Sequence, residues 1–134
     1  MAITGFDHVA ITVADVEATT AFYDKLFGVK VGFDYAPDGK TLVRQLLMGE
    51  NKIMFSVHQS GNGIALVARK PTPGSVDLCF RWDKSIQAAM DLLAQHNIAI
   101  TDGPSPRTYS DGRKSSSVYF RDPDGNLIEL MAPA

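Results

Sequence analysis

The stretch FDHVAITVADVEATTAFYDKLFG, residues 6–28, joins a short alternating segment directly to a helical pattern. Residues 8–13 alternate between larger apolar side chains and smaller or polar ones, as in a strand with one buried face. Asp15 is a suitable N-cap for the following helix, and Gly28 is placed to end it. One side of that helix is apolar, with Val16, Thr19, Phe22 and Leu26 at helical spacing. The stretch therefore predicts a strand that leads into an amphipathic helix.

Three more extended segments follow this helix, which completes a first module at about residues 4–58. We expect these strands at about 31–35, 41–48 and 53–58. Residues 59–74, QSGNGIALVARKPTPG, are rich in Gly and Pro and are predicted to form a linker.

The second half repeats this order of segments in a module at about residues 75–132. SVDLCFRW (75–82) predicts a strand, and DKSIQAAMDLLAQHN (83–97) predicts a helix that Asn97 is able to close. Three further strands are expected at residues 98–100, 115–120 and 127–131. The chain is thus predicted to be strand, helix and three strands, twice over.

The bulk composition limits the classes of protein that the chain can belong to. Its 134 residues are enough for one domain with a hydrophobic core. A net charge of −2 gives no electrostatic reason to expect a nucleic-acid or membrane partner, and no segment is apolar for long enough to span a membrane. A single cysteine excludes an internal disulfide framework and fits a reducing compartment. We therefore expect a cytoplasmic globular protein.

Each predicted module has one helix, which leaves one face of its sheet free. The larger apolar residues of the alternating strands are expected to face the helix, so the other side chains point to the free face. Four potential metal ligands fall on these free faces: His8, His58, Asp77 and Glu129. Sheets that curl into a cup would bring them together. A carboxylate such as Glu129 in an apolar strand is costly unless a cation or strong donor pairs with it.

Several motifs also carry a family resemblance. FDHVAITVADVEATTAFYDKLFG (6–28) and YFRDPDGNLIEL (119–130) resemble the vicinal oxygen chelate superfamily, which includes glyoxalase I, extradiol dioxygenases, fosfomycin-resistance transferases and bleomycin-binding proteins. PTPGSVDLCF (71–80), GPSPRT (103–108) and SVYFRDPDGNLIE (117–129) are similar to a subgroup of small glyoxalase-domain proteins with virulence-associated bacterial members.

The resemblance covers nearly the whole chain and implies an α+β fold. Two βαβββ modules would form curled mixed sheets around a cup for metal and substrate. The resemblance further implies a homodimer with a divalent metal ion (Ni, Zn, Mn, Co or Fe) that binds adjacent oxygen atoms of a small-molecule substrate.

The ligand positions follow from the same resemblance. Superfamily enzymes place one metal ligand on the first strand of each module and one on the last, and here these places fall on His8, His58, Asp77 and Glu129. Bacterial glyoxalase I typically has His, Glu, His and Glu in that order, so the middle pair is exchanged in type. His58 fits only with a longer strand or a small bulge, because simple superposition sets Phe55 opposite Glu129. Asp77 either binds the metal, orients a metal-bound histidine or pairs with an arginine.

Three functions are compatible with this resemblance. The first is a glyoxalase-like lyase or isomerase in which Glu129 is the catalytic base. The second is an Fe(II) extradiol dioxygenase, since His8, His58 and Glu129 form a two-His-one-carboxylate set, although dioxygenases have a histidine where Asp77 stands. The third is a metal-free small-molecule binding protein of the antibiotic (bleomycin) resistance kind.

Three residues are candidates for contact with the substrate. Arg81 either binds an anionic substrate group or balances the charge of a neighbouring carboxylate. Tyr119 shares a strand face with Ser117, and Arg107 is expected on a loop between strands. Cys79 has no activating base in the sequence pattern, so we expect it to be a small buried residue and not a nucleophile.

Overall fold

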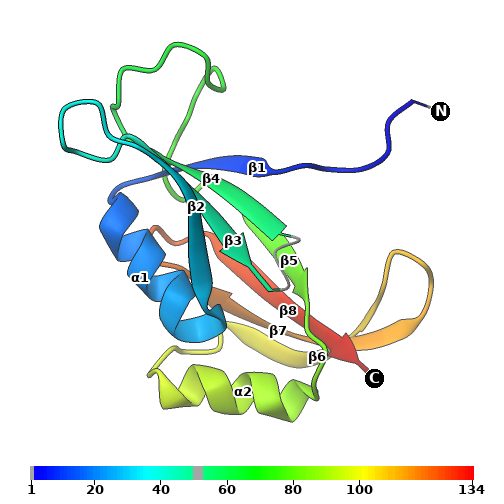
Figure 1. The fold of residues 1–134 in the computed structure, drawn as a ribbon. Helices are drawn as coiled ribbons and strands as arrows, with labels where there is room; N and C mark the ends of the chain where they lie inside the picture. The colour runs from blue at the N-terminus through cyan, green and yellow to red at the C-terminus, as the bar shows by residue number, and fades with distance from the viewer. Residues whose placement is uncertain (1, 50–52) are drawn as a thin grey trace. The chain divides into compact units, whose positions relative to one another are not determined.

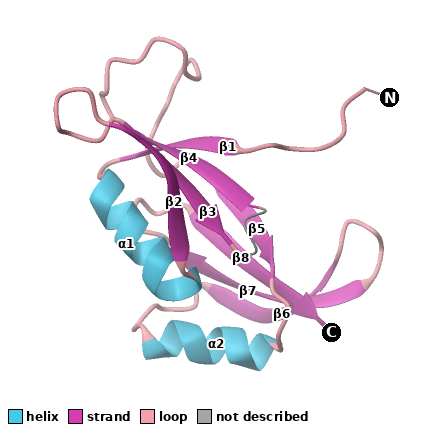
Figure 2. Cartoon of the chain, viewed as in Figure 1, coloured by secondary structure: helices cyan, strands magenta, loops and turns pink. Residues whose placement is uncertain are grey.

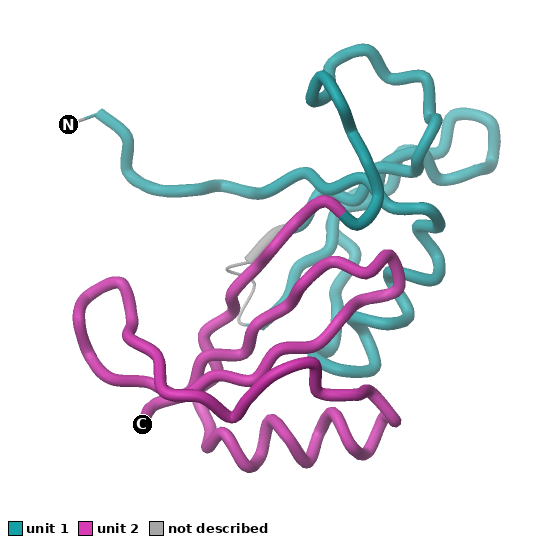
Figure 3. Tube along the Cα trace, turned by 180° about the vertical axis from the view of Figure 1, so that it is seen from behind, with its two compact units in different colours: residues 1–74 teal, residues 75–134 magenta. Residues whose placement is uncertain are grey.

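The first half of the chain folds as strand, helix and three strands. The computed structural model describes residues 2–49 and 53–134, and these divide into two compact units, Met1–Gly74 and Ser75–Ala134 (Figure 3). Unit 1 contains β1 (Val9–Val13), α1 (Val16–Phe27), β2 (Val29–Tyr35), β3 (Val43–Met48) and β4 (Ile53–Gln59) (Figure 1).

The second half has the same order of elements. Unit 2 contains β5 (Asp77–Arg81), α2 (Ile86–Gln95), β6 (Asp102–Thr108), β7 (Lys114–Arg121) and β8 (Leu127–Pro133) (Figure 2). Each unit forms a four-stranded sheet, with the strand orders β1-β4-β3-β2 and β5-β8-β7-β6. The first and last strands pair in parallel, and the remaining pairs are antiparallel. These mixed sheets confirm the predicted α+β fold of two βαβββ modules.

One expected strand was misplaced, and the error also concerns Arg107. The second strand of the second module is predicted at residues 98–100, but β6 runs from Asp102 to Thr108 and includes Arg107. Two prolines argue against a strand in the interior of a sheet. β6 tolerates them because it is the edge strand and its register with β7 shifts between Asp102 and Ser105. Arg107 therefore lies on a strand and not on a loop.

Local capping explains where the two helices begin and end. The Asp15 carboxylate accepts hydrogen bonds from the first-turn backbone of α1, and Gly28 ends that helix with a φ of 70°. Ser85 caps α2, and Asn97 follows it in the left-handed region. α1 buries Tyr23 where Phe22 was expected. Among the described residues, no helix is long and apolar enough to cross a membrane.

The alternation of the strands separates a helix-covered face from a free face in each sheet. The buried side chains face the helices: Ile11, Val13, Leu46, Phe55 and Val57 in unit 1, and Val118, Phe120, Ile128, Leu130 and Ala132 in unit 2. Their neighbours along each strand point the other way. This leaves Ser56, His58, Cys79 and Glu129 on the free faces.

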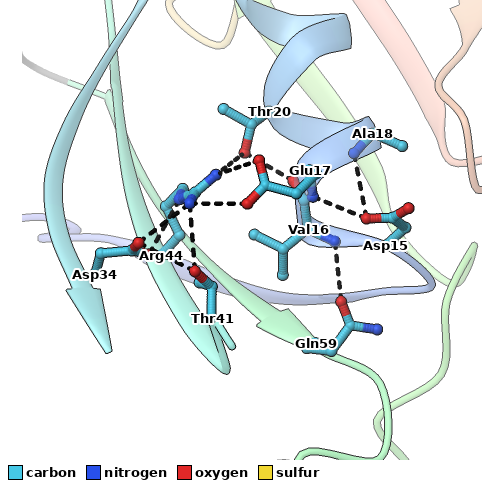
Figure 4. A network of polar contacts seen from close by, with 9 residues as sticks. All are labelled: Asp15, Val16, Glu17, Ala18, Thr20, Asp34, Thr41, Arg44 and Gln59. Atoms are coloured by element: carbon cyan, nitrogen blue, oxygen red, sulfur yellow. Dashed lines mark hydrogen bonds and ion pairs between the residues drawn. The ribbon is translucent and has the colours of Figure 1, made fainter. Parts of the chain in front are cut away.

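In unit 1, Arg44 of β3 ties the start of α1 to the sheet (Figure 4). Its guanidinium lies 3.0 Å from Asp34 of β2 and 3.0 Å from Glu17 of α1, and it donates to the hydroxyls of Thr20 and Thr41. The Arg44 side chain is only 12% exposed, whereas Glu17 and Asp34 remain 71% and 36% exposed. The hydrogen bond from Arg44 lowers the pKa of Asp34. A single buried cation thus links three elements.

We expect Arg44→Met to lower the free energy of unfolding by about 1–2 kcal/mol at pH 7, because hydrogen bonds to two charged partners are lost. The folded-state pKa of Asp34 is lowered, so its contribution is present above the unfolded value of about 3.9 and is lost as the pH falls through the folded value. Urea unfolding of both proteins at pH 7 and at about pH 3 should therefore give a smaller difference in acid. Arg69→Met, in the exposed linker, is the control. A difference that grows in acid would contradict the assignment.

Candidate functional site

Unit 1 places two histidines near the free face of its sheet. His8 precedes β1 directly, is exposed, and lies with its Nδ1 2.8 Å from the Asp7 carboxylate. His58 is half-buried in β4 and pairs with Thr12. Burial of the imidazole, with a further contribution from the charge of His8, lowers the pKa of His58. His58 is therefore mainly neutral at pH 7, which is the form that binds a metal.

The register of β4 differs from the one expected for a metal ligand at His58. Ala10 pairs with Ser56 in unit 1, just as Cys79 pairs with Glu129 in unit 2. When the units are matched through these pairs, the counterpart of Glu129 is Ser56, and not Phe55. The pairing of β4 with β1 and with β3 runs without a register shift, so the suggested bulge is absent from the described pairs. His58 reaches the free face by simple alternation, two residues beyond Ser56.

In unit 2, the turn before β8 sets the position of Glu129. Asp122 accepts hydrogen bonds from the backbone and side chain of Asn126, and both residues are buried. The Asn126 side chain in turn accepts from the backbone N–H of Val76, and Leu127 donates to the Val76 carbonyl. The turn is therefore bonded to the residue just before β5. This fixes the register in which Cys79 lies opposite Glu129.

A buried hydroxyl explains how an apolar strand tolerates the Glu129 carboxylate. Ser117 of β7 is fully buried, and its hydroxyl donates to Oε2 of Glu129 at 2.6 Å. Glu129 is half-buried and forms no ion pair with any residue that the structure describes. The predicted alternative, an ion pair with Arg81, is thus not formed. A carboxylate with one held oxygen and no cation can still accept a proton or bind a metal.

Cys79 lies beside Glu129 but is not an activated nucleophile. Partial burial of the sulfur, together with the negative charges of Glu129 and Asp77, raises the pKa of Cys79 to about 12. The thiol is therefore protonated at neutral pH, when it can donate a hydrogen bond to the carboxylate. As a residue Cys79 is exposed, so the expectation of a buried position is wrong.

The remaining candidates lie on the same sheet as Glu129. Tyr119 pairs with Glu129 across β7 and β8, and the Nε of Arg107 donates to the Tyr119 hydroxyl at 3.0 Å. Asp77 is exposed at the start of β5 and has no ion pair in the described part of the chain. The guanidinium of Arg81 lies over the ring of Tyr109, 5.4 Å from its centroid. Tyr109 was not predicted, since nothing in YSDGR indicates that its ring is buried.

Each unit presents two of the four candidate metal ligands. Within the described part of either unit, no three His, Cys, Asp or Glu side chains form a metal site. Unit 1 offers two imidazoles and unit 2 two carboxylates, at His8, His58, Asp77 and Glu129. Imidazole and carboxylate ligands suit Ni, Zn, Mn, Co and Fe ions, so this set of donors fits a divalent metal.

Two βαβββ units with polar free faces define the glyoxalase-type class of α+β proteins. The family described as Glyoxalase/Bleomycin resistance protein/Dioxygenase superfamily matches residues 5–130, and the chain belongs to it. This confirms the resemblance seen in the sequence.

Similar proteins are known from bacteria and a fungus. The chain is 38% identical to virulence protein STM3117 of Salmonella typhimurium, over 97% of this chain and 85% of that protein. It is also 38% identical to glyoxalase domain-containing protein RDO1 of Mycosarcoma maydis, over 98% and 70% of the two chains. The solved structure of integron cassette protein VCH_CASS1 from V. cholerae matches with a TM-score of 0.86 and 36% identity, covering 100% of this chain and 98% of that one.

More distant homologues carry the names of enzymes. The chain is 27% identical to metallothiol transferase FosB of Lysinibacillus sphaericus, over 97% of this chain and 83% of that protein. The family thus includes metal-dependent enzymes.

We expect Glu129→Gln to speed the alkylation of Cys79 at pH 8 on the order of tenfold, because loss of the adjacent negative charge lowers the thiol pKa. The rate of reaction with iodoacetamide, followed by mass spectrometry, measures this at the only cysteine of the chain. In the unsubstituted protein this rate should still be rising above pH 9. Asp91→Asn, on α2, is the matched control and should leave the rate unchanged. A wild-type rate that levels off near pH 8.5 would contradict the raised pKa.

Proposed function

We propose that this chain is a divalent-metal-dependent enzyme of the glyoxalase-like type, acting as a lyase or isomerase on a small substrate with adjacent oxygen atoms. The observation that carries this proposal is the state of Glu129. Its carboxylate is half-buried on the free face, is held at Oε2 by Ser117, and has no ion pair among the described residues. Arg107 contributes positive charge near this carboxylate without forming an ion pair with it, so a bound metal cation would stabilise the partly buried anion further.

His8, His58 and Glu129 would hold the metal ion, with Asp77 as the fourth ligand or as a partner of a metal-bound imidazole. When bound, such an ion supplies Lewis acidity to the two substrate oxygens. The neutral state of His58 supports its part in this set, because the lowered pKa leaves the imidazole free of a competing proton. His58 Nδ1 also has no hydrogen-bond partner in residues 2–49 and 53–134.

The proton transfer in this proposal is assigned to Glu129. Ser117 donates to Oε2, which keeps a second lone pair with which it would hold the metal, and Oε1 is the atom assigned to accept a proton from substrate and return it. The protonated thiol of Cys79 adds a neutral donor beside the carboxylate and does not compete as a base. Arg81, Tyr119 and Arg107 contact the bound substrate. We further propose that the protein works as a cytoplasmic homodimer.

A second candidate function is metal-free binding of a small molecule such as an antibiotic. The observation in its favour is the register of β4, which puts the hydroxyl of Ser56 where unit 2 has the carboxylate of Glu129. A hydroxyl is a weaker ligand for a divalent ion than a carboxylate, so unit 1 matches the superfamily pattern less closely at this position.

Metal loading separates these functions. We expect the purified protein to bind about one Ni, Zn, Mn, Co or Fe ion per chain, and its melting temperature to rise with added metal. His8→Ala and Glu129→Gln should each weaken metal affinity at least about tenfold, because each removes one ligand. Metal content by mass spectrometry and thermal unfolding with and without metal are the measurements.

His96→Ala is the matched control, since His96 caps α2 and is not a proposed ligand. A protein that binds none of these metals, and whose melting temperature is unaffected by them, would support the metal-free function and overturn the enzyme. Cleavage of catechols that requires both Fe(II) and oxygen would instead identify the extradiol dioxygenase reaction.

A further inference from the structure

The guanidinium of Arg81 has no ion-pair partner among the residues that the structure describes. It lies at the end of β5, is exposed, and has its Cζ 5.4 Å from the centroid of the Tyr109 ring. In the part of the chain that the structure describes, the side chain of Arg81 forms no ion pair, and its recorded partner is the Tyr109 ring. Asp77 and Glu129, the carboxylates on the same face, do not pair with it. A cation–π contact therefore orients Arg81 while its five N–H donors stay free.

Tyr109 is well suited to hold this guanidinium in place. Its ring is buried, with a relative exposure of 7%, and its backbone closes the hairpin between β6 and β7 through bonds with Arg113 and Gly112. β5 and β6 are the two edge strands of this sheet. Because Arg81 contacts Tyr109, the hairpin between β6 and β7 extends across the sheet to the edge formed by β5. The platform under Arg81 is a fixed part of the fold.

A second arginine, Arg113, also lies over the Tyr109 ring. The Cζ of Arg113 is 4.9 Å from the Tyr109 centroid, but its Nε is paired with Asp111 at 2.8 Å. Hydrogen bonds from Arg113, with a contribution from the charge of Arg81, lower the pKa of Asp111, which keeps this carboxylate ionised at neutral pH. Asp111 thus forms its ion pair with Arg113, whereas Arg81 interacts with Asp111 only through the longer-range charge effect.

Arg107, the other arginine near Glu129, does not have this freedom. Its Nε donates to Tyr119, its Nη1 donates to the Pro106 carbonyl at 2.8 Å, and its Nη2 lies 3.7 Å from Asp102. An arginine whose donors are already engaged is a poor receptor for a further anion. Of these two arginines, Arg81 is therefore the better receptor for an anion.

Arg81 lies close to Glu129, the proposed base, on the same sheet. Arg81 is two residues beyond Cys79, and Cys79 pairs with Glu129. Side chains two residues apart on a strand face are about 6.6 Å apart. An anionic group of the substrate that is bound by Arg81 would therefore be only a few bonds away from the substrate atoms that contact the Glu129 carboxylate.

We propose that the substrate carries an oxyanion group, a carboxylate or a phosphate-type group, that is bound by Arg81 on the Tyr109 platform. This inference rests on the proposed function, since it names the substrate class of the same face. The planar guanidinium binds two oxygens of such a group at once.

The test uses the binding of simple anions, without metal or turnover. The Nε–Hε signals of ¹⁵N-labelled protein are followed by NMR during addition of inorganic phosphate, and separately of acetate, at constant ionic strength. We expect a saturable shift of the Arg81 signal, which the spectrum of Arg81→Gln identifies. Stronger binding of phosphate assigns a phosphate-type group, and stronger binding of acetate assigns a carboxylate.

Variants make the result specific. Arg81→Lys keeps the charge but loses the two-pronged donor, so its anion affinity, read from backbone amide shifts near β5, should fall about tenfold. Tyr109→Leu should weaken binding by freeing the guanidinium. Arg121→Gln removes another exposed arginine of β7 and should leave the affinity unchanged.

Linear shifts that do not saturate, or equal shifts at Arg81 and Arg121, would overturn the proposal. So would an affinity that Arg81→Gln leaves unaltered in a variant with an otherwise preserved spectrum. Because no metal is added, failure of the metal experiment would leave a positive anion result standing, and failure here would leave the metal experiment intact.

Discussion

The hydrogen bonds between Asn126 and Val76 are the constraint on which the face around Glu129 depends. Parallel strands cannot be joined by a tight turn, so their register has to be set by something other than the connection between them. Here the buried side chain of Asn126, itself held by Asp122, binds the backbone just before β5. A slip of one residue would turn Glu129 towards α2 and its neighbours towards the free face. The turn, which lies three to seven residues before Glu129 in the sequence, thus decides the environment of the carboxylate.

In unit 1 a different side chain aligns the parallel first and last strands. Gln59, the last residue of β4, accepts a hydrogen bond from the N–H of Val16 (Figure 4). Its side-chain amide also donates to the carbonyl of Ala14. These bonds join the end of β4 to the segment between β1 and α1. Both units therefore use a buried or partly buried amide to align first and last strands. The repeated topology is therefore maintained by unlike residues in the two units.

Much of the fold could be predicted because period-2 and helical patterns record which side chains are buried. The segments around Ile11, Phe80 and Ile128 alternate clearly, and each forms the expected strand. β6 was missed because its prolines are tolerated only at a sheet edge, and edge position depends on strand order. The pairing of Ser56 was missed for a similar reason, since register follows from hydrogen bonds between strands. The faces of His58 and Glu129 followed from alternation, whereas the stacking of Arg81 on Tyr109 depends on how a hairpin bends.

The bond from Ser117 to Glu129 has a consequence for stereochemistry. With Oε2 engaged by a fully buried hydroxyl, the carboxylate cannot turn freely about its last bond, which gives Oε1 a fixed direction. A base with a single fixed oxygen approaches a substrate carbon along one line and from one side. A reaction carried out by this carboxylate would therefore distinguish mirror-image substrates and would yield products of one handedness.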